Sequence, residues 1–90
     1  MQKYEEIYKA LVNATITYEC LYRLADLAHA KHVHAGGLYE HANAAYDKVA
    51  ELAFDLQTAF LQEGHALSNF TQVSVEIEAN AAKQVKRIML

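Results

Sequence analysis

The sequence predicts an all-α fold, in which a long antiparallel helical hairpin is joined by a third helix and assembles into an oligomeric helical bundle. Three observations support this class: hydrophobic residues make up 53% of the 90 positions, proline is absent, and glycine occurs only three times. Such a composition favours long, uninterrupted helices. A chain of this length makes a single helical domain, here residues 1–90. Its core is marginal without a disulfide, a metal or a partner subunit.

The first expected helix runs from about residue 3 to residue 34. Its polar side chains recur every three or four positions in a narrow strip, whereas nearly all other positions are apolar or aromatic. The pairs Glu5–Lys9 and Glu19–Arg23 have the order and spacing that support a helix. Because two further helices are too small to cover both apolar sides, we expect this helix to mediate oligomerisation.

Gly36 and Gly37 are expected to end this helix, since glycine relieves the left-handed strain of a helix C-terminus. The connection is then short, and a second helix over about residues 38–63 folds back antiparallel. Gly64 marks its end, and Ser68 or Asn69 is expected to cap the next helix. The apolar seam of the second helix follows steps of three and four: Leu38, Ala42, Ala45, Val49, Leu52, Leu56 and Phe60.

The third segment, about residues 69–88, has two interpretations in its first part. Residues 73–78 alternate between apolar and polar types as a strand does, yet Phe70, Val73, Ile77 and Ala81 also fit one face of a helix. A lone strand would have no partner in this chain, so we expect a helix.

Several classes of protein are disfavoured by the composition. Cys20 is the single cysteine, which excludes an intrachain disulfide and suits a reducing cytoplasm. Glu5 and Glu6 stand where a secretory signal needs basic residues, and no run of eighteen apolar residues exists to enter a membrane. A net charge of -3 argues against nucleic acid as a partner. No nucleophile–base pair or glycine-rich phosphate loop indicates an enzyme.

Four of the five histidines lie within residues 28–41, around the glycine pair. Asp26, His29 and His32 share one side of the first helix, and a tight hairpin brings His41 towards the same end. Imidazoles with a carboxylate are a normal ligand set for iron or zinc. Two other interpretations stay open: histidines that complement a helix dipole, and imidazoles that titrate together as a pH switch. No cofactor is certain.

Tyrosines suggest an interface on the first helix. Tyr4 with Tyr8 and Tyr18 with Tyr22 are pairs four residues apart, and Leu11 follows the same side. Together with Arg23, such side chains are also suited to stack on a nucleotide-like ligand between subunits. The sequence therefore predicts a small non-enzymatic homo-oligomer that binds a host protein or a small ligand at its subunit interfaces.

The pattern Ala28-His29-x-x-His32, followed by Gly36-Gly37-x-Tyr39-Glu40-His41, Tyr46 and Asp55, resembles small phage-encoded Dps-like and other ferritin-like proteins. The resemblance covers residues 20–64. It implies a bundle, oligomerisation, and a metal site that begins with His29 and His41, with ferroxidase-type activity as the corresponding enzyme function. The family's further acidic ligands fall on Ala45, Leu56 and Phe60, so a ferritin-like metal binder is the alternative function.

A second resemblance is to secreted WXG-type helical hairpins. The tryptophan of that motif would fall at His34 or Ala35, and Phe70 is followed four residues later by Ser74 rather than by an acid.

Overall fold

The computed structural model describes residues 3–32 and 34–89, and its regular structure is helical as predicted. The elements are α1 (Tyr4–Ala30), α2 (Gly36–Gln62), a single turn of 3₁₀ helix, η1 (Leu67–Asn69), and α3 (Phe70–Ile88). Residues 73–78, with their strand-like alternation, lie within α3. Helical periodicity therefore prevails over the two-residue alternation in this segment.

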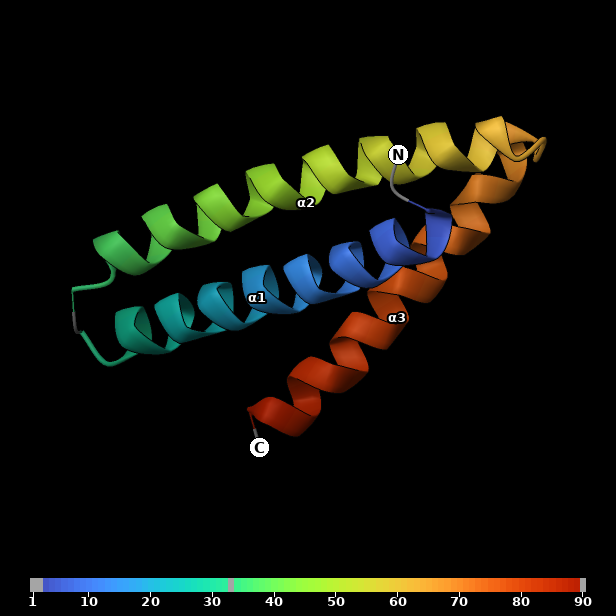
Figure 1. Ribbon diagram of the computed structural model, residues 1–90. Helices are drawn as coiled ribbons and strands as arrows, with labels where there is room; N and C mark the ends of the chain where they lie inside the picture. The colour runs from blue at the N-terminus through green and yellow to red at the C-terminus, as the bar shows by residue number, and fades with distance from the viewer. Residues whose placement is uncertain (1–2, 33, 90) are drawn as a thin grey trace.

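The helices form an elongated molecule of 50 × 23 × 21 Å. α1 and α2 lie antiparallel along each other, as the hairpin prediction requires (Figure 1). α3 returns along α1, diverges from the hairpin as it runs, and ends short of the corner between α1 and α2 (Figure 1). It packs mainly against α1, so the three helices do not form three equivalent pairs.

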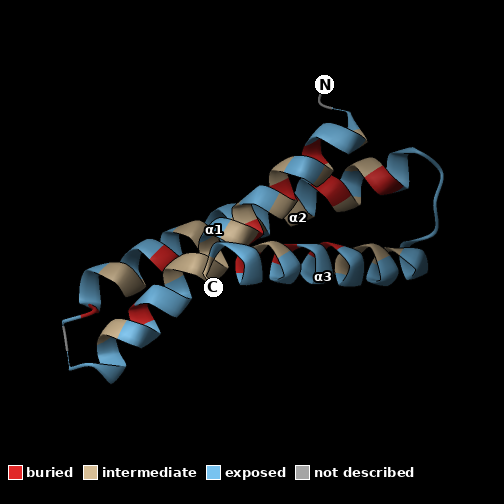
Figure 2. Cartoon of the chain, turned by 90° about the horizontal axis from the view of Figure 1, so that it is seen from below, coloured by how far each residue is buried: buried red, intermediate tan, exposed pale blue. Residues whose placement is uncertain are grey.

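The core lies where all three helices meet. Its buried residues are Ile7, Leu11, Leu52, Leu56 and Ile77. The seam predicted for α2 faces inward, since Ala42, Leu52, Leu56 and Phe60 are all buried. Buried positions follow the inner faces of the helices, and the outer faces are exposed (Figure 2).

The corner between α1 and α2 differs from the prediction. α1 ends at Ala30 rather than near residue 34, and His32 adopts a left-handed conformation with a φ of 61°. The backbone amide of His32 donates to the carbonyl of His29 at 3.0 Å and closes the last turn. Histidine is among the residues that tolerate this region, so the glycine pair is not needed there. Position 33 lies outside the described residues.

Gly36 and Gly37 are instead the first two residues of α2. The backbone passes close to a side chain at Gly36, where a Cβ atom would lie 3.1 Å from Nε2 of His34. Gly64 behaves as predicted, because it follows the end of α2 with a φ of 89°. Asn69 occupies the N-terminal cap position of α3, but its side chain makes no capping hydrogen bond.

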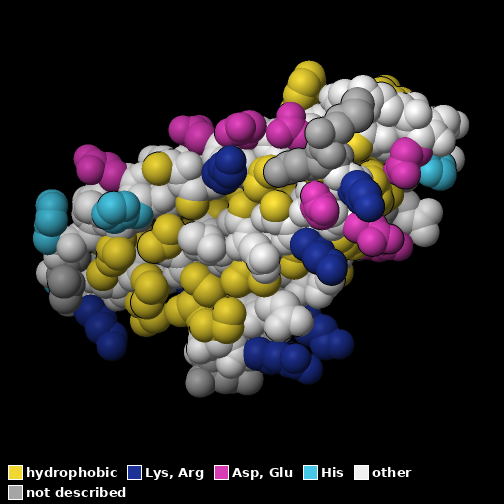
Figure 3. Space-filling model, viewed as in Figure 1, with side chains coloured by type: hydrophobic (Ala, Val, Ile, Leu, Met, Phe, Trp, Pro, Cys, Tyr) yellow, Lys and Arg dark blue, Asp and Glu magenta, His cyan; other side chains and the backbone are white. Residues whose placement is uncertain are grey.

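The outer surface separates charge and apolar character. Exposed acidic residues form a row along α2, and basic side chains gather near the C-terminal part of α3 (Figure 3). Hydrophobic side chains are open to solvent over the half of α1 nearest the corner, where Leu24 and Leu27 are 45% and 48% exposed. In the described ranges, no helix combines the length and apolar character that a bilayer span needs.

Candidate interaction groove

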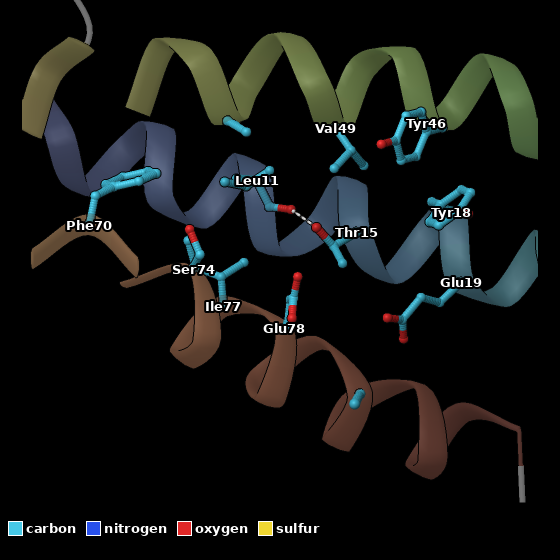
Figure 4. A pocket seen from close by; sticks show the side chains of 12 residues that line it. Leu11, Thr15, Tyr18, Glu19, Tyr46, Val49, Phe70, Ser74, Ile77 and Glu78 are labelled. Carbon is cyan, nitrogen blue, oxygen red and sulfur yellow. Dashed lines mark hydrogen bonds between the residues drawn. The ribbon is translucent and has the colours of Figure 1, made fainter. Parts of the chain in front are cut away.

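A groove of about 380 Å³ runs between α2 and α3, and α1 forms its floor. It exists because α3 packs on α1 and diverges from α2, leaving the inner flanks of both helices open to one side (Figure 4). The residues that line it come from all three helices: Leu11, Thr15, Tyr18 and Glu19 from α1, Tyr46, Val49 and Ala53 from α2, and Phe70, Ser74, Ile77, Glu78 and Ala82 from α3.

The floor of the groove is mainly apolar. Leu11 and Ile77 belong to the core and are 4% and 3% exposed. The hydroxyl of Thr15 is also buried, but it donates to the carbonyl of Leu11 at 2.8 Å and so offers no free donor to a ligand. A ligand on this floor would therefore be held by apolar contact rather than by a hydrogen-bond pattern.

Two carboxylates give the groove its charge. Glu19 extends from α1 and Glu78 from α3, both into the space between these helices (Figure 4). Within the described residues, the single side-chain ion pair joins Lys48 to Glu51 on the outside of α2 at 3.9 Å, so neither groove carboxylate is paired. An occupant of the groove is favoured if it brings a cation.

A row of four tyrosines continues from the groove towards the corner. Tyr18 contacts both Tyr46 and Tyr22, with ring centroids 5.3 and 5.9 Å apart, and Tyr22 meets Tyr39 edge to face at 5.9 Å. Tyr22 and Tyr46 remain 43% and 53% exposed. Tyr18 and Tyr22, predicted as interface residues, thus join the two helices of the hairpin and also contribute exposed aromatic surface.

Asp26 and Tyr39 form the one polar side-chain contact between α1 and α2 in residues 3–32 and 34–89. The Tyr39 hydroxyl donates to Oδ1 of Asp26 at 2.9 Å. This hydrogen bond raises the pKa of Tyr39, because the neutral phenol is the form that donates. Asp26 therefore has a hydrogen-bond partner across the hairpin.

The other predicted interface residues of α1 lie within the chain's own packing. Leu11 is a core residue, as described above. Tyr4 contacts Tyr8 and Phe60 with tilted rings whose centroids are 6.2 and 6.1 Å away, and burial raises the pKa of Tyr4. These side chains stabilise the contact of α1 with the end of α2, and Tyr4 and Tyr8 are half-buried there.

Arg23 lies far along α1 from Tyr4 and Tyr8, the first pair of predicted interface tyrosines. It lines a separate hollow of about 400 Å³ with Asp26, Leu27, Ala30 and Met89. Tyr8 is fifteen positions earlier on the same helix, which is about 22 Å along the axis. Within one chain, a single nucleotide-like ligand therefore does not reach both Tyr8 and Arg23, and the ligand predicted between subunits would need these two side chains from different copies.

The corner histidines are only partly brought together. His29, His32 and His34 line a hollow of about 530 Å³ with Ala35, Gly36 and Tyr39. His41 is two positions after Tyr39, which places it about 200° around α2 and on the other side of the helix. In the described part of the chain, no three His, Cys, Asp or Glu side chains are grouped so as to hold a metal ion. The predicted set of Asp26, His29, His32 and His41 is thus not assembled.

The sequence and the fold were compared with known protein families, with curated proteins and with solved structures, and no match was found.

Sequence reasoning missed the α2 and α3 walls of the groove. An exposed apolar side chain beside it was the available signal, because Val75 is 58% exposed and by helical periodicity lies on the same side of α3 as Ala82, which lines the groove. A large apolar side chain this exposed is a feature of a binding surface when it borders a groove.

Proposed function

We propose that this chain is a small helical interaction protein that works as a homo-oligomer and receives a helix of another polypeptide in the groove between α2 and α3. The groove carries this proposal. Three helices line it, and a fourth helix laid along it would complete a four-helix bundle. Recognition of an amphipathic helix in an apolar groove is a recurring mode of protein interaction.

The extent of the surface supports association. The chain exposes 6375 Å², whereas size scaling gives about 5,300 Å² for a folded monomer of 10.1 kDa. Its radius of gyration is 14.9 Å, compared with about 12 Å for a compact domain of this length. The excess area is about the share that one partner contributes to a standard interface. An oligomer would bring the ratio of surface to volume back to the usual range.

The composition of the groove favours a helix over a polar ligand. Its floor offers apolar contact, the Thr15 hydroxyl is already used, and its charged groups are the carboxylates of Glu19 and Glu78. An amphipathic helix with a basic flank matches both features.

Arginine substitution on either side of α2 tests the proposal. Ala53 lines the groove and Ala44 is exposed outside it, so Ala53→Arg and Ala44→Arg change the same residue type on the same helix. Sedimentation equilibrium should give the wild type and Ala44→Arg a mass of twice 10.1 kDa or more, and Ala53→Arg a lower mass. A wild-type monomer at millimolar concentration, or an Ala53→Arg protein that associates as the wild type does, would contradict the proposal.

Metal binding, in line with a relationship to phage ferritin-like proteins, is a second candidate. One observation favours it: His29, His32 and His34 line the same hollow. A site there needs either a rearranged corner or a ligand from a second copy. Added Zn²⁺ should then raise the melting temperature of the wild type and of His65→Ala, but not of His29→Ala. Equal shifts in all three proteins would exclude this site, and a shift lost in His41→Ala would indicate the ligand set expected from the sequence.

A further inference from the structure

We propose that α3 pairs antiparallel with α3 of a second copy of this chain, around a two-fold axis at Ala82. This inference rests on the proposed function. Glu78 and Ala82 line the groove, and the inference identifies α3 of a second copy as the helix that enters the groove. The surface concerned consists of Val75, Glu78, Ala82, Lys86 and Met89, and is called the α3 stripe below.

The α3 stripe forms one face of the helix. Its members follow each other in steps of three, four, four and three residues, which keeps them on one side of an α-helix. Val75 is 58% exposed, Glu78, Ala82 and Lys86 are exposed, and Met89 is half-buried. This face is distinct from the one that packs on α1, which carries Ile77, Ala81 and Val85.

The α3 stripe is complementary to itself in the antiparallel direction. Glu78 and Lys86 are each four residues from Ala82, and Val75 and Met89 are each seven residues from it. A two-fold axis at Ala82 therefore sets Glu78 against Lys86 of the second copy and Val75 against Met89 of the second copy, each twice. The small side chain of Ala82 allows the two helices to approach closely where they cross.

Charge also selects this direction. Within the described residues, neither Glu78 nor Lys86 forms an ion pair. Residues three or four positions apart are neighbours on a helix surface. Glu78 has no basic residue at these positions, and Lys86 has no acidic residue at them, so neither can form an ion pair of this kind within α3. A parallel pair in register would place Glu78 against Glu78 and Lys86 against Lys86, which repel. On a wider scale, Lys86 near the C-terminal end of α3 would meet the carboxylates of the second copy's groove.

Reversal of each charge tests the pairing. Glu78→Lys and Lys86→Glu each place two like-charge pairs across the proposed interface, so each should weaken the dimer by at least about tenfold in Kd at low salt. An equimolar mixture of the two variants should form a heterodimer as tight as the wild-type dimer, because each contact between positions 78 and 86 then joins a lysine to a glutamate. Sedimentation velocity with one variant fluorescently labelled measures this directly.

Glu76→Lys and Lys83→Glu are the matched controls, because both positions are exposed on α3 but away from the α3 stripe. Each control changes the net charge by the same amount as the corresponding stripe variant, and it should leave the Kd of the dimer within about twofold of the wild-type value. If the wild type associates and Ala53→Arg abolishes association, but the stripe variants behave as their controls or the mixture shows no heterodimer, the pairing of α3 is overturned while the groove proposal stands. A monomeric wild type overturns both.

Discussion

The hairpin of α1 and α2 is built differently in its two halves. In the half that α3 covers, large aliphatic side chains such as Leu11, Leu52 and Leu56 form the core. Among the described residues of the half near the corner, the fully buried side chains are those of Ala25 and Ala42. The difference shows that large aliphatic residues need a third helix to cover them, whereas a bare helix pair relies on small residues for close approach.

Tyrosines complete the corner half. The rings of Tyr18, Tyr22, Tyr39 and Tyr46 cover the contact between the helices on one side, and their hydroxyl groups tolerate water. Such a surface is stable enough to hold the hairpin and still exposes aromatic area. The covered half therefore supplies most of the folding free energy, and the corner half keeps more of its aromatic surface exposed.

Truncation of a leucine in each half should give the largest difference. Leu56 is fully buried among three helices, so Leu56→Ala should lower the free energy of unfolding by about 3–5 kcal/mol. Leu24 is 45% exposed in the corner half, and Leu24→Ala should change the free energy of unfolding by about 0.5 kcal/mol or less. Urea denaturation monitored by circular dichroism measures both. Similar losses in the two variants would show that the two halves do not differ as described.

Enlargement of an alanine should reveal how close the helices lie in the corner half. Ala42 has no exposed surface, so Ala42→Leu forces the helices apart and should cost about 1–3 kcal/mol of unfolding free energy. Ala44 is exposed on the same helix, and Ala44→Leu should be nearly neutral. If Ala42→Leu is as stable as the wild type, the corner half has more space than its buried alanines indicate.

The seam of α2 and the helical character of α3 were predictable from the sequence, because both depend on periodicity within one element. Leu52, Leu56 and Phe60 are buried as their spacing indicated. The strand-like alternation of residues 73–78 was correctly outweighed by the helical spacing of Phe70, Val73, Ile77 and Ala81.

The corner and the groove were not predictable in the same way. The glycine pair suggested where α1 ends, but the left-handed conformation is taken by His32, and glycine propensity alone cannot locate it. The groove depends on the angle between α3 and the hairpin, which is set by packing between elements far apart in sequence. For the same reason, the predicted metal set failed to assemble: linear spacing placed His41 at the correct end of α2 but on the wrong side.

The glycines of the two connections should respond in opposite directions. Gly64, at the covered end, has a φ of 89°, so Gly64→Ala should lower the unfolding free energy by about 1 kcal/mol. Gly37, at the corner, is in the first turn of α2 with no atom near its missing Cβ, and Gly37→Ala should raise stability by about 0.4–1 kcal/mol. Thermal denaturation of the two variants checks both signs. A stabilising Gly64→Ala would mean that the second connection does not adopt this conformation.

The smallest effect concerns the hydrogen bond between Tyr39 and Asp26, which ties the corner half together. The pKa of Tyr39 is raised from the ordinary tyrosine value of 10.0 because its hydroxyl donates to the Asp26 carboxylate. Any stabilisation from this bond is therefore fully present below that ordinary value and is lost as the pH rises through the raised pKa. Because the pair is exposed, the change in stability should be small, and the pKa itself is the better readout.

Asp26→Asn removes the charge and should return the pKa of Tyr39 towards 10.0. Carbon-detected NMR of ring-labelled tyrosine follows each of the six tyrosines separately through the titration. Tyr4 provides an internal reference, because its pKa is raised mainly by burial at the covered end and should not respond to Asp26→Asn. Asp47→Asn, on the exposed side of α2, should leave Tyr39 unchanged as well. A Tyr39 that titrates alike in the wild type and in Asp26→Asn would show that α1 and α2 are not joined by this bond in solution, and that alanine and tyrosine packing alone holds the corner half.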